Sequence, residues 1–359
     1  MKLLFAAHSL NVGGIETALI TLLEELVKKE NEITLVLEKK EGIFLDTLNP
    51  KIKVIEYTPS CIKLVPLRKL INLFKQIKFK LKYKNKFDFA AAYATYSLSS
   101  GFVARAASEN SALWVHLDYL TQYENDEAKT KAYYQELKAE EFKSIIFVSK
   151  EARDNFLKLF PHCKEKAIYC NNLINGKKIL EKAEEQIKEA KQEIPTFLNV
   201  GRHDERQKRL SKLIEVAEKL KNDGLQFKIL FVGEGQDSAL YKKMVSDKKL
   251  EDTIIFLGKK KNPYPYYKIS DCVILTSDYE GYPVVFIESM ILKKQIITTN
   301  VSDYEQIENG FGIVTTKETE SIYSAMKNFI QNGFELKQEF DYEKFNKEIL
   351  ESLEKVFKK

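Results

Sequence analysis

Hydrophobic residues recur along this chain with two alternating periods. Short apolar runs of strand length are followed by stretches in which apolar residues return every three to four positions, as along Ile15–Lys29. This alternation predicts parallel sheets with helices on both faces. In the first half, the expected strands are Lys2–Ala7, Glu32–Glu38, Lys51–Tyr57, Phe87–Tyr93, Ala112–Leu117, Lys143–Ser149 and Lys166–Cys170.

The alternation breaks at Gly176–Glu193, a charged segment with little apolar face that we interpret as a linker or surface helix. Strands are expected again at Thr196–Gly201, Phe227–Gly233, Thr253–Gly258, Cys272–Ser277, Gln295–Thr299 and Gly312–Thr315. We therefore predict an α/β chain with two Rossmann-like domains. The expected parts are a first domain over 1–172, a linker over 173–194, a second domain over 195–335 and a helical tail over 336–359.

Composition narrows the class of protein without indicating a function. The chain has 359 residues, enough for two separate cores, and its net charge of +5 gives no argument for nucleic acid as a partner. Its first residues lack a signal-peptide pattern, and no apolar run is long enough to span a bilayer. The four cysteines lack metal-ligand spacing. We therefore expect a cytoplasmic protein with reduced thiols.

Two carboxylates flank a turn that follows one of the expected strands. Glu280 precedes the turn Gly281–Pro283, and Glu288 lies further along, on the expected helix. Ligands of open α/β sheets bind at the carboxyl ends of strands, and a helix that begins near Pro283 offers amides and a positive dipole end to a phosphate. The arrangement suits a nucleotide-sugar. A solvated strand–turn–helix corner accounts for it equally well.

Two further loops after expected strands carry candidate phosphate contacts. Gly13 and Gly14 allow close backbone approach at a helix start, although a tight turn explains them as well. Arg202 and Lys208 follow the first strand of the second domain, where a diphosphate would need neutralising. The alternative for these cations is a solvated loop paired with its own acids.

Two histidines follow strands of the first domain. His116 could act as a base, a hydrogen-bond donor or a substrate anchor, and His8 follows the first strand. A purely structural histidine is the competing interpretation at both positions. The loop Val232–Asp237 resembles a dinucleotide fingerprint only in part, because Ser238 replaces its third glycine. We interpret that loop as a turn.

Residues 62–87 predict a basic amphipathic helix. The segment holds nine lysines and arginines and no acidic residue. Its apolar residues recur at helical spacing, at Leu64, Leu67, Ile71, Phe74, Ile77 and Leu81. Such a helix suits an anionic membrane surface, at about 1 kcal/mol per cation close to the lipid. The alternative is an ordinary domain helix whose apolar side faces the core. The aromatic residues form no stacking platform for RNA.

Taken together, these motifs resemble those of GT-B fold glycosyltransferases, in particular the retaining enzymes of family 4. The resemblance is strongest over Phe197–Thr299, within which Glu280 and Glu288 form a Glu-x7-Glu motif. It also rests on Arg202 with Lys208 and on the N-terminal Gly-Gly loop. The chain departs from the family at two points. Arg209 replaces the glycine usual after the clamp lysine, and Asn171–Leu173 replaces Asn-Gly.

The resemblance implies two domains that face each other across a cleft, with the C-terminal helix returning to the first. It implies donor-sugar contact by Glu280, ribose binding by Glu288, and diphosphate binding by Arg202 and Lys208. The remaining implied residues are Gly13 and Gly14 at the donor phosphate, the turn and helix start at Tyr282, Pro283, Val284 and Val285, and His116 at the sugar and acceptor end.

The resemblance also implies the reaction. We expect a retaining hexosyl- or N-acetylhexosaminyl-transferase that uses a UDP-sugar and needs no cofactor or metal, since the sequence contains no Asp-x-Asp. The expected acceptor is a glycan or polyprenyl-linked glycan of bacterial surface polysaccharide synthesis. The enzyme would contact the inner face of the cell membrane through residues 62–87. Alternatives are a nucleotide-sugar epimerase or phosphorylase of the same fold, or a non-catalytic partner subunit.

Overall fold

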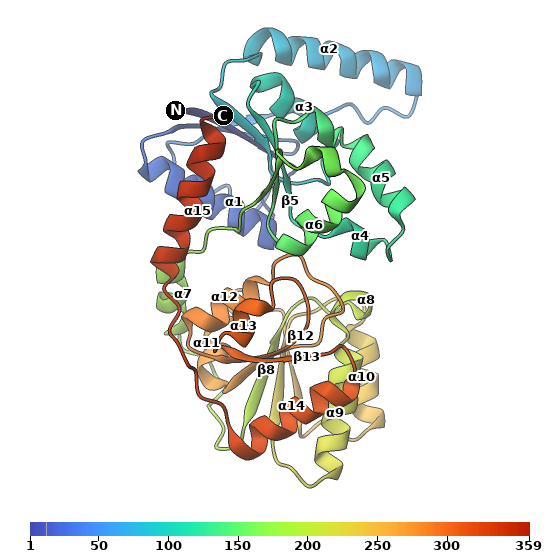
Figure 1. The fold of residues 1–359 in the computed structure, drawn as a ribbon, viewed down its shortest axis with the longest axis vertical. Coiled ribbons are helices and arrows are strands. Elements are labelled where there is room, and N and C mark those ends of the chain that lie inside the picture. Colours follow the sequence, from blue (N-terminus) through green and yellow to red (C-terminus); the bar gives the residue numbers. More distant parts are fainter. Residues whose placement is uncertain (12) are drawn as a thin grey trace. The chain divides into compact units, whose positions relative to one another are not determined.

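The computed structural model describes residues 1–11 and 13–359 and divides the chain into two compact units. Unit 1 comprises Met1–Ile174 and Phe345–Lys359, and unit 2 comprises Asn175–Lys344. Each unit is an α/β layer structure around a parallel sheet, of seven strands in unit 1 and six in unit 2 (Figure 1). This confirms the expected fold class. No helix of the described residues is long and apolar enough to cross a bilayer.

The sheet of unit 1 has the strand order β3-β2-β1-β4-β5-β6-β7, with every pair parallel. Its strands are β1 (Lys2–Ala7), β2 (Glu32–Leu37), β3 (Lys53–Glu56), β4 (Phe89–Ala92), β5 (Ser111–Val115), β6 (Ser144–Phe147) and β7 (Ala167–Tyr169). The central strands are buried on both faces, which explains their continuous apolar runs.

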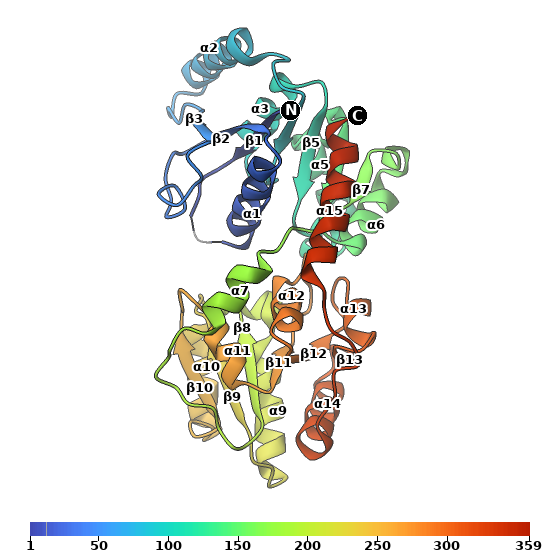
Figure 2. The same cartoon turned by 90° about the vertical axis from the view of Figure 1, so that its left-hand side faces the viewer.

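The helices of unit 1 cover both faces of this sheet. They are α1 (Gly14–Lys28), α2 (Val65–Tyr83), α3 (Leu98–Ala107), α4 (Tyr119–Gln122), α5 (Glu127–Glu136) and α6 (Lys150–Leu159), with 3₁₀ turns at Ala139–Glu141 and Pro161–Cys163. The final helix, α15 (Tyr342–Phe357), packs the Phe357 ring 4.6 Å from that of Phe89. Figure 2 shows α15 alongside unit 1, where Glu354 pairs with Lys29 just after α1.

Helix α2 lies on the outside of unit 1, next to α3 (Figure 1). Phe79 is its only fully buried residue, and its ring packs 5.9 Å from that of Phe102 on α3. The opposite side is apolar and exposed, with Phe74 63% and Leu81 81% accessible. The alternative in which the apolar side of this helix faces the core is therefore wrong, since only Phe79 and the half-buried Tyr83 of α2 pack against the core.

The sheet of unit 2 has the order β10-β9-β8-β11-β12-β13 and is also fully parallel. Its strands are β8 (Thr196–Val200), β9 (Lys228–Val232), β10 (Ile254–Gly258), β11 (Cys272–Leu275), β12 (Gln295–Thr299) and β13 (Gly312–Thr315). Its helices are α7 (Gly176–Ala183), α8 (Glu205–Lys208), α9 (Leu210–Asn222), α10 (Ser238–Asp247), α11 (Tyr264–Ile269), α12 (Val284–Ile291), α13 (Glu305–Glu308) and α14 (Thr319–Asn332).

The helix expected over Gly176–Glu193 is shorter than predicted. Helix α7 ends at Ala183, and the chain from 184 to 195 forms no helix. Ile179 and Ala183 bury one side of α7, which contacts α11 and α12. The charged residues that follow offer no comparable apolar stripe, and a short helix without packing is marginal in water.

Candidate active site

The candidate donor site of unit 2 lies where the strand order of the sheet reverses. Strand β8 has β9 on one side and β11 on the other, so the loops after β8 and β11 leave the same edge and diverge. This reversal is where open α/β sheets form a ligand crevice. The first loop carries Arg202 and leads through α8 to Lys208, and the second carries Glu280.

Lys208 and Glu280 form an ion pair in this crevice. The Lys208 Nζ lies 2.5 Å from the Glu280 Oε1, and the two side chains are only 18% and 8% exposed. The Ser277 hydroxyl donates to the same oxygen over 2.6 Å, and the Gln207 amide approaches the Glu280 Oε2 at 3.3 Å. The carboxylate is therefore fixed from both loops. Two residues that the sequence prediction placed in one site are brought together.

Arg202 differs from Lys208 in being largely free. Its side chain is 66% exposed and donates to the Gln207 Oε1 at 3.1 Å, with Asp204 at 3.7 Å. Gln207 therefore links Arg202 to the Lys208–Glu280 pair, because its side chain contacts both the Arg202 guanidinium and the Glu280 carboxylate. An exposed guanidinium keeps most of its donors for a ligand such as a diphosphate.

Arg209 stands where a glycine was expected, and its backbone has a conformation typical of glycine. Its φ of 49° and ψ of 43° are left-handed, a conformation that glycine adopts without strain. The side chain bonds Asp278 at 2.5 Å, and Lys212 bonds the other Asp278 oxygen at 2.7 Å. Burial would raise the pKa of Asp278, but the hydrogen bonds from Lys212 and Arg209 outweigh it and lower that pKa. The contacts of Asp278 with Arg209 and Lys212 therefore form a second link between the segments after β8 and β11.

Glu288 lies on the second turn of α12 and is held by two phenols. The Tyr264 hydroxyl donates to one carboxylate oxygen over 3.1 Å and the Tyr267 hydroxyl to the other over 2.8 Å. Burial raises the pKa of Glu288, and the two hydroxyls offset this only in part. The arrangement presents a desolvated carboxylate that can accept hydrogen bonds from a polyol such as a ribose.

The turn between Glu280 and Glu288 leads directly into α12. Pro283 is the N-cap with extended backbone, and Val284 and Val285 occupy the first helical positions. Their amides precede the first intrahelical hydrogen bonds, so they are available to an anion. The Tyr282 hydroxyl donates to Gln306 at 3.1 Å, which anchors the turn to α13.

In unit 1, the Gly-Gly loop leads into α1. Gly13 is the N-cap of this helix and Gly14 its first residue. A Cβ on Gly13 would collide with the Glu16 carboxylate, whereas one on Gly14 would meet nothing. The open face at Gly14 allows close approach of a ligand to the backbone.

His116 follows β5 and has one ring nitrogen engaged. Its Nε2–H donates to the Tyr93 carbonyl oxygen over 2.8 Å, and its ring lies 4.9 Å from the Tyr93 ring. Burial lowers the pKa of His116 to about 4. The imidazole is therefore neutral at physiological pH, and only its Nδ1 remains to accept a hydrogen bond.

Sequence reasoning did not single out four residues that contact Glu280 or Glu288, namely Gln207, Ser277, Tyr264 and Tyr267. Gln207 lies between Arg202 and Lys208, and Ser277 ends the expected strand shortly before Glu280, so these positions were the available signal. The tyrosines lie on α11, about twenty residues before Glu288, and nothing in their spacing indicates contact with it.

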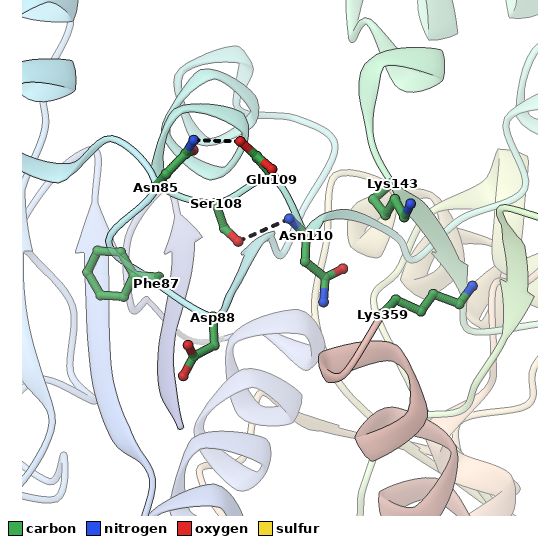
Figure 3. A pocket seen from close by; sticks show the side chains of 8 residues that line it. All are labelled: Asn85, Phe87, Asp88, Ser108, Glu109, Asn110, Lys143 and Lys359. Atoms are coloured by element: carbon green, nitrogen blue, oxygen red, sulfur yellow. Dashed lines mark hydrogen bonds between the residues drawn. The ribbon is translucent and has the colours of Figure 1, made fainter.

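A cavity of about 430 Å³ lies at the other end of the unit 1 sheet, where β4, β5 and β6 begin (Figure 3). Two carboxylates and two lysines are among its lining residues, and Asn85 bonds Glu109 across one wall. None of the eight lining residues is a predicted site residue. The lining is Asn85, Phe87, Asp88, Ser108, Glu109, Asn110, Lys143 and Lys359.

Part of the chain, including the candidate site of unit 2, is similar to a known protein family. Residues 181–347 match the model of a family described as glycosyl transferases group 1. Over these residues, which are less than half of its length, the chain is similar to group 1 glycosyl transferases. The match includes both loops of the Lys208–Glu280 crevice and Glu288.

Among the proteins similar to this chain is the capsular polysaccharide biosynthesis glycosyltransferase CapH of Staphylococcus aureus. It is 30% identical over 173 residues, which are 46% of this chain and 45% of CapH. The aligned stretches span only 22% to 45% of the first three curated relatives, so these relatives are matched over less than half of their length.

Solved structures match the chain over nearly its whole length. Anabaena HepE in complex with UDP and glucose has a TM-score of 0.75 at 19% identity and covers 99% of both chains. A variant of S. aureus TarM in complex with Fondaparinux, alpha-GlcNAc-glycerol and UDP has a TM-score of 0.70 at 14% identity, over 100% of both chains. At these identities the match establishes the fold, which is that of the GT-B glycosyltransferases.

Proposed function

We propose that this protein transfers a sugar from a nucleotide-sugar, with UDP as the nucleotide, to a glycan or lipid-linked glycan acceptor. The observation that carries the proposal is the Lys208–Glu280 pair at the strand-order reversal of unit 2, within the region similar to group 1 glycosyl transferases. It combines a cation for the phosphate and a carboxylate for the sugar hydroxyls in one crevice.

The chemistry follows from the charge that develops on the leaving nucleoside diphosphate. As the sugar–phosphate bond breaks, negative charge grows on the phosphate oxygens, and fixed cations and helix amides lower the barrier. Lys208, Arg202 and the first amides of α12 supply these groups. Because the protein itself provides this positive charge, we propose transfer without a metal. Retention follows if the acceptor attacks on the face of the leaving phosphate, which then takes the acceptor proton.

The relatives support the choice of donor and of biological setting. HepE was crystallised with UDP and glucose, and the name of CapH places it in capsular polysaccharide biosynthesis. We infer that this chain takes a UDP-hexose or UDP-N-acetylhexosamine in the synthesis of a bacterial surface polysaccharide.

We also propose that α2 attaches the enzyme to an anionic membrane, at the inner face of the cell membrane. The exposed apolar side of α2 comprises Leu67, Leu70, Leu73, Phe74, Ile77 and Leu81, and the N-cap residue Leu64 is also exposed. Lysines flank it on both sides, and the segment from 62 to 87 has no acidic residue. A helix of this kind lies in the interfacial plane with its apolar side inserted among the lipids. A polyprenyl-linked acceptor would be presented at that surface.

Thermal shift against UDP-glucose, UDP-N-acetylglucosamine and GDP-mannose tests the donor proposal. One UDP-sugar should raise the melting temperature of the native protein and fail to do so for Lys208→Met. Lys243→Met, on the exposed side of α10, is the matched control and should behave as the native protein. If none of the nucleotide-sugars protects the protein, the proposal fails. Turnover of a bound UDP-sugar without acceptor, beyond slow hydrolysis, would indicate an epimerase instead.

A further inference from the structure

A second polar cluster occupies the strand-order reversal of unit 1. Strand β1 lies between β2 and β4, so the residues that follow these three strands meet at one edge. His8 follows β1, Glu38 follows β2, and Ser97 and Ser99 begin α3 after β4. The position is equivalent in topology to that of the Lys208–Glu280 pair in unit 2, and such an edge is where α/β sheets bind ligands.

Three residues contact a single oxygen of the Glu38 carboxylate. Its Oε2 accepts hydrogen bonds from Ser97 at 2.7 Å and Ser99 at 2.6 Å, and the His8 Nδ1 lies 3.4 Å away. Within the described part of the chain, the Glu38 Oε1 and the His8 Nε2 have no partner, and both side chains are partly accessible. Burial would raise the pKa of Glu38, but hydrogen bonds from Ser99, Ser97 and His8 outweigh it and lower that pKa. The carboxylate is therefore charged and orientated, with one oxygen left for a ligand.

Tyr96 adds an exposed aromatic surface to the cluster. The side chain is 49% exposed, and its hydroxyl donates to the Glu16 Oε1 over 2.9 Å. Its ring stands edge to face with the His8 ring, at 6.3 Å between centroids. Glu16 thus fixes the ring, which stays open to solvent beside the free atoms of Glu38 and His8.

We propose that this cluster, hereafter the Glu38 cluster, binds the sugar of the acceptor through its hydroxyl groups. Two adjacent sugar hydroxyls can donate to the Glu38 Oε1 and bond the His8 Nε2, while the apolar face of the sugar ring covers Tyr96. The carboxylates of Glu38 and Glu16 oppose a phosphate in the same place. The inference rests on the proposed function, because it specifies the acceptor as a glycosyl group rather than a bare lipid phosphate.

Saturation-transfer NMR with simple sugars tests this cluster separately from transfer. The probes are the methyl glycosides of glucose, galactose and N-acetylglucosamine, with glycerol 3-phosphate as the anionic comparison. They carry no alkyl chain that would bind α2, and UDP is present throughout to fill the donor site. At least one glycoside should receive saturation from the native protein. Glu38→Gln should weaken its binding at least about tenfold, the usual effect of losing a hydrogen bond to a charged group.

The matched control is Glu32→Gln, at the opposite end of the same strand, where the side chain is 76% exposed. It should bind the glycoside as the native protein does. Tyr96→Phe should keep binding and Tyr96→Ala should lose it, which separates the ring from its hydroxyl. Melting curves establish that each variant is folded.

Equal signals for Glu38→Gln and the native protein, signals from glycerol 3-phosphate alone, or signals from no glycoside would each overturn the inference. Protection by UDP-sugars, measured in parallel, reports on the donor site of unit 2 alone. A failure of the Glu38 cluster is thereby distinguished from a failure of the proposed function.

Discussion

Lys208 places its ammonium nitrogen 2.5 Å from the Glu280 Oε1, in a crevice that leaves both side chains largely covered. The desolvation of both charges is offset only while each has the other, so the loss of one partner leaves a buried charge unpaired. This relationship allows a structural effect of mutation to be separated from a catalytic one.

We predict that Lys208→Met alone and Glu280→Gln alone each destabilise unit 2, with Lys208→Met costing about 3 kcal/mol. The double variant should be more stable than the sum of the single effects implies, because neither charge is then left alone. All three should lose transfer activity by a factor on the order of 100 to 1000. Urea unfolding and steady-state rates measure the two quantities. A stable double variant that regains activity would show that the pair is structural.

The strained turn at Arg209 supports a second prediction. Arg209→Gly should leave stability nearly unchanged, because relief of about 1 kcal/mol of left-handed strain offsets the loss of a part-buried ion pair with Asp278, which keeps its bond to Lys212. Arg209→Val should destabilise by more than 1 kcal/mol, on the order of the cost of a β-branched residue in this conformation. Thermal melts of both variants test this. Equal melting temperatures for the two would contradict the prediction.

Glu288 supports a prediction about pH. Its pKa is raised in the folded protein by burial, so the folded state binds the proton more tightly than the unfolded state. The native protein must therefore lose stability as pH rises from the ordinary carboxyl value of 4.5 through the raised value. Glu288→Gln has no such loss. Its melting temperature should gain on that of the native protein as pH rises above 4.5, while UDP binding weakens.

A matched variant checks the cause of this shift. Tyr267→Phe removes a hydroxyl that lowers the Glu288 pKa, so the loss of stability with pH should extend to higher pH. Glu339→Gln, on the surface, should leave the margin between native protein and Glu288→Gln unchanged. A margin that is constant with pH would refute the assignment.

His116 supports a prediction about pH in which the change of stability has the opposite sign. Burial lowers its pKa to about 4, so the unfolded state binds the proton more readily between that value and the ordinary 6.5. Stability from this group is full above pH 6.5 and falls as pH drops towards 4. The C2 proton of His116 should titrate with a midpoint near 4 in NMR spectra, and His116→Asn should flatten this acid decline. A midpoint near 6.5 would show that the ring is solvated.

The sequence was sufficient to predict the parallel sheets and to single out Lys208 and Glu280, which the structure brings into contact, because sheets depend on local periodicity and these two residues follow neighbouring strands. It was insufficient for contacts between distant elements. The bonds of Tyr264 and Tyr267 to Glu288 join α11 to α12, and the Glu38 cluster joins the loops after β1, β2 and β4. The spacing of these residues along the chain does not indicate that they are in contact.

Helix α2 shows a related limit. Composition indicated a basic amphipathic helix, but the sequence left open which side would pack on the domain. The structure resolves this through Phe79, which packs against Phe102 and leaves the larger apolar side exposed.

The exposed side of α2 supports the last prediction. Phe74→Glu and Leu81→Glu should each reduce sedimentation with phosphatidylglycerol vesicles, because each removes an inserted apolar side chain and adds a charge repelled by the lipid. Leu240→Glu, at a leucine on α10 that is also exposed, is the control and should sediment as the native protein does. Replacing Lys75, Lys78 and Lys82 by Gln should weaken binding by about 1 kcal/mol per lysine at low salt and by less at high salt, since salt screens exposed charges. Because α2 is anchored to unit 1 through Phe79, Phe74→Glu and Leu81→Glu should leave the melting temperature unchanged. If the Glu variants bind vesicles as well as Leu240→Glu does, α2 is not the membrane contact.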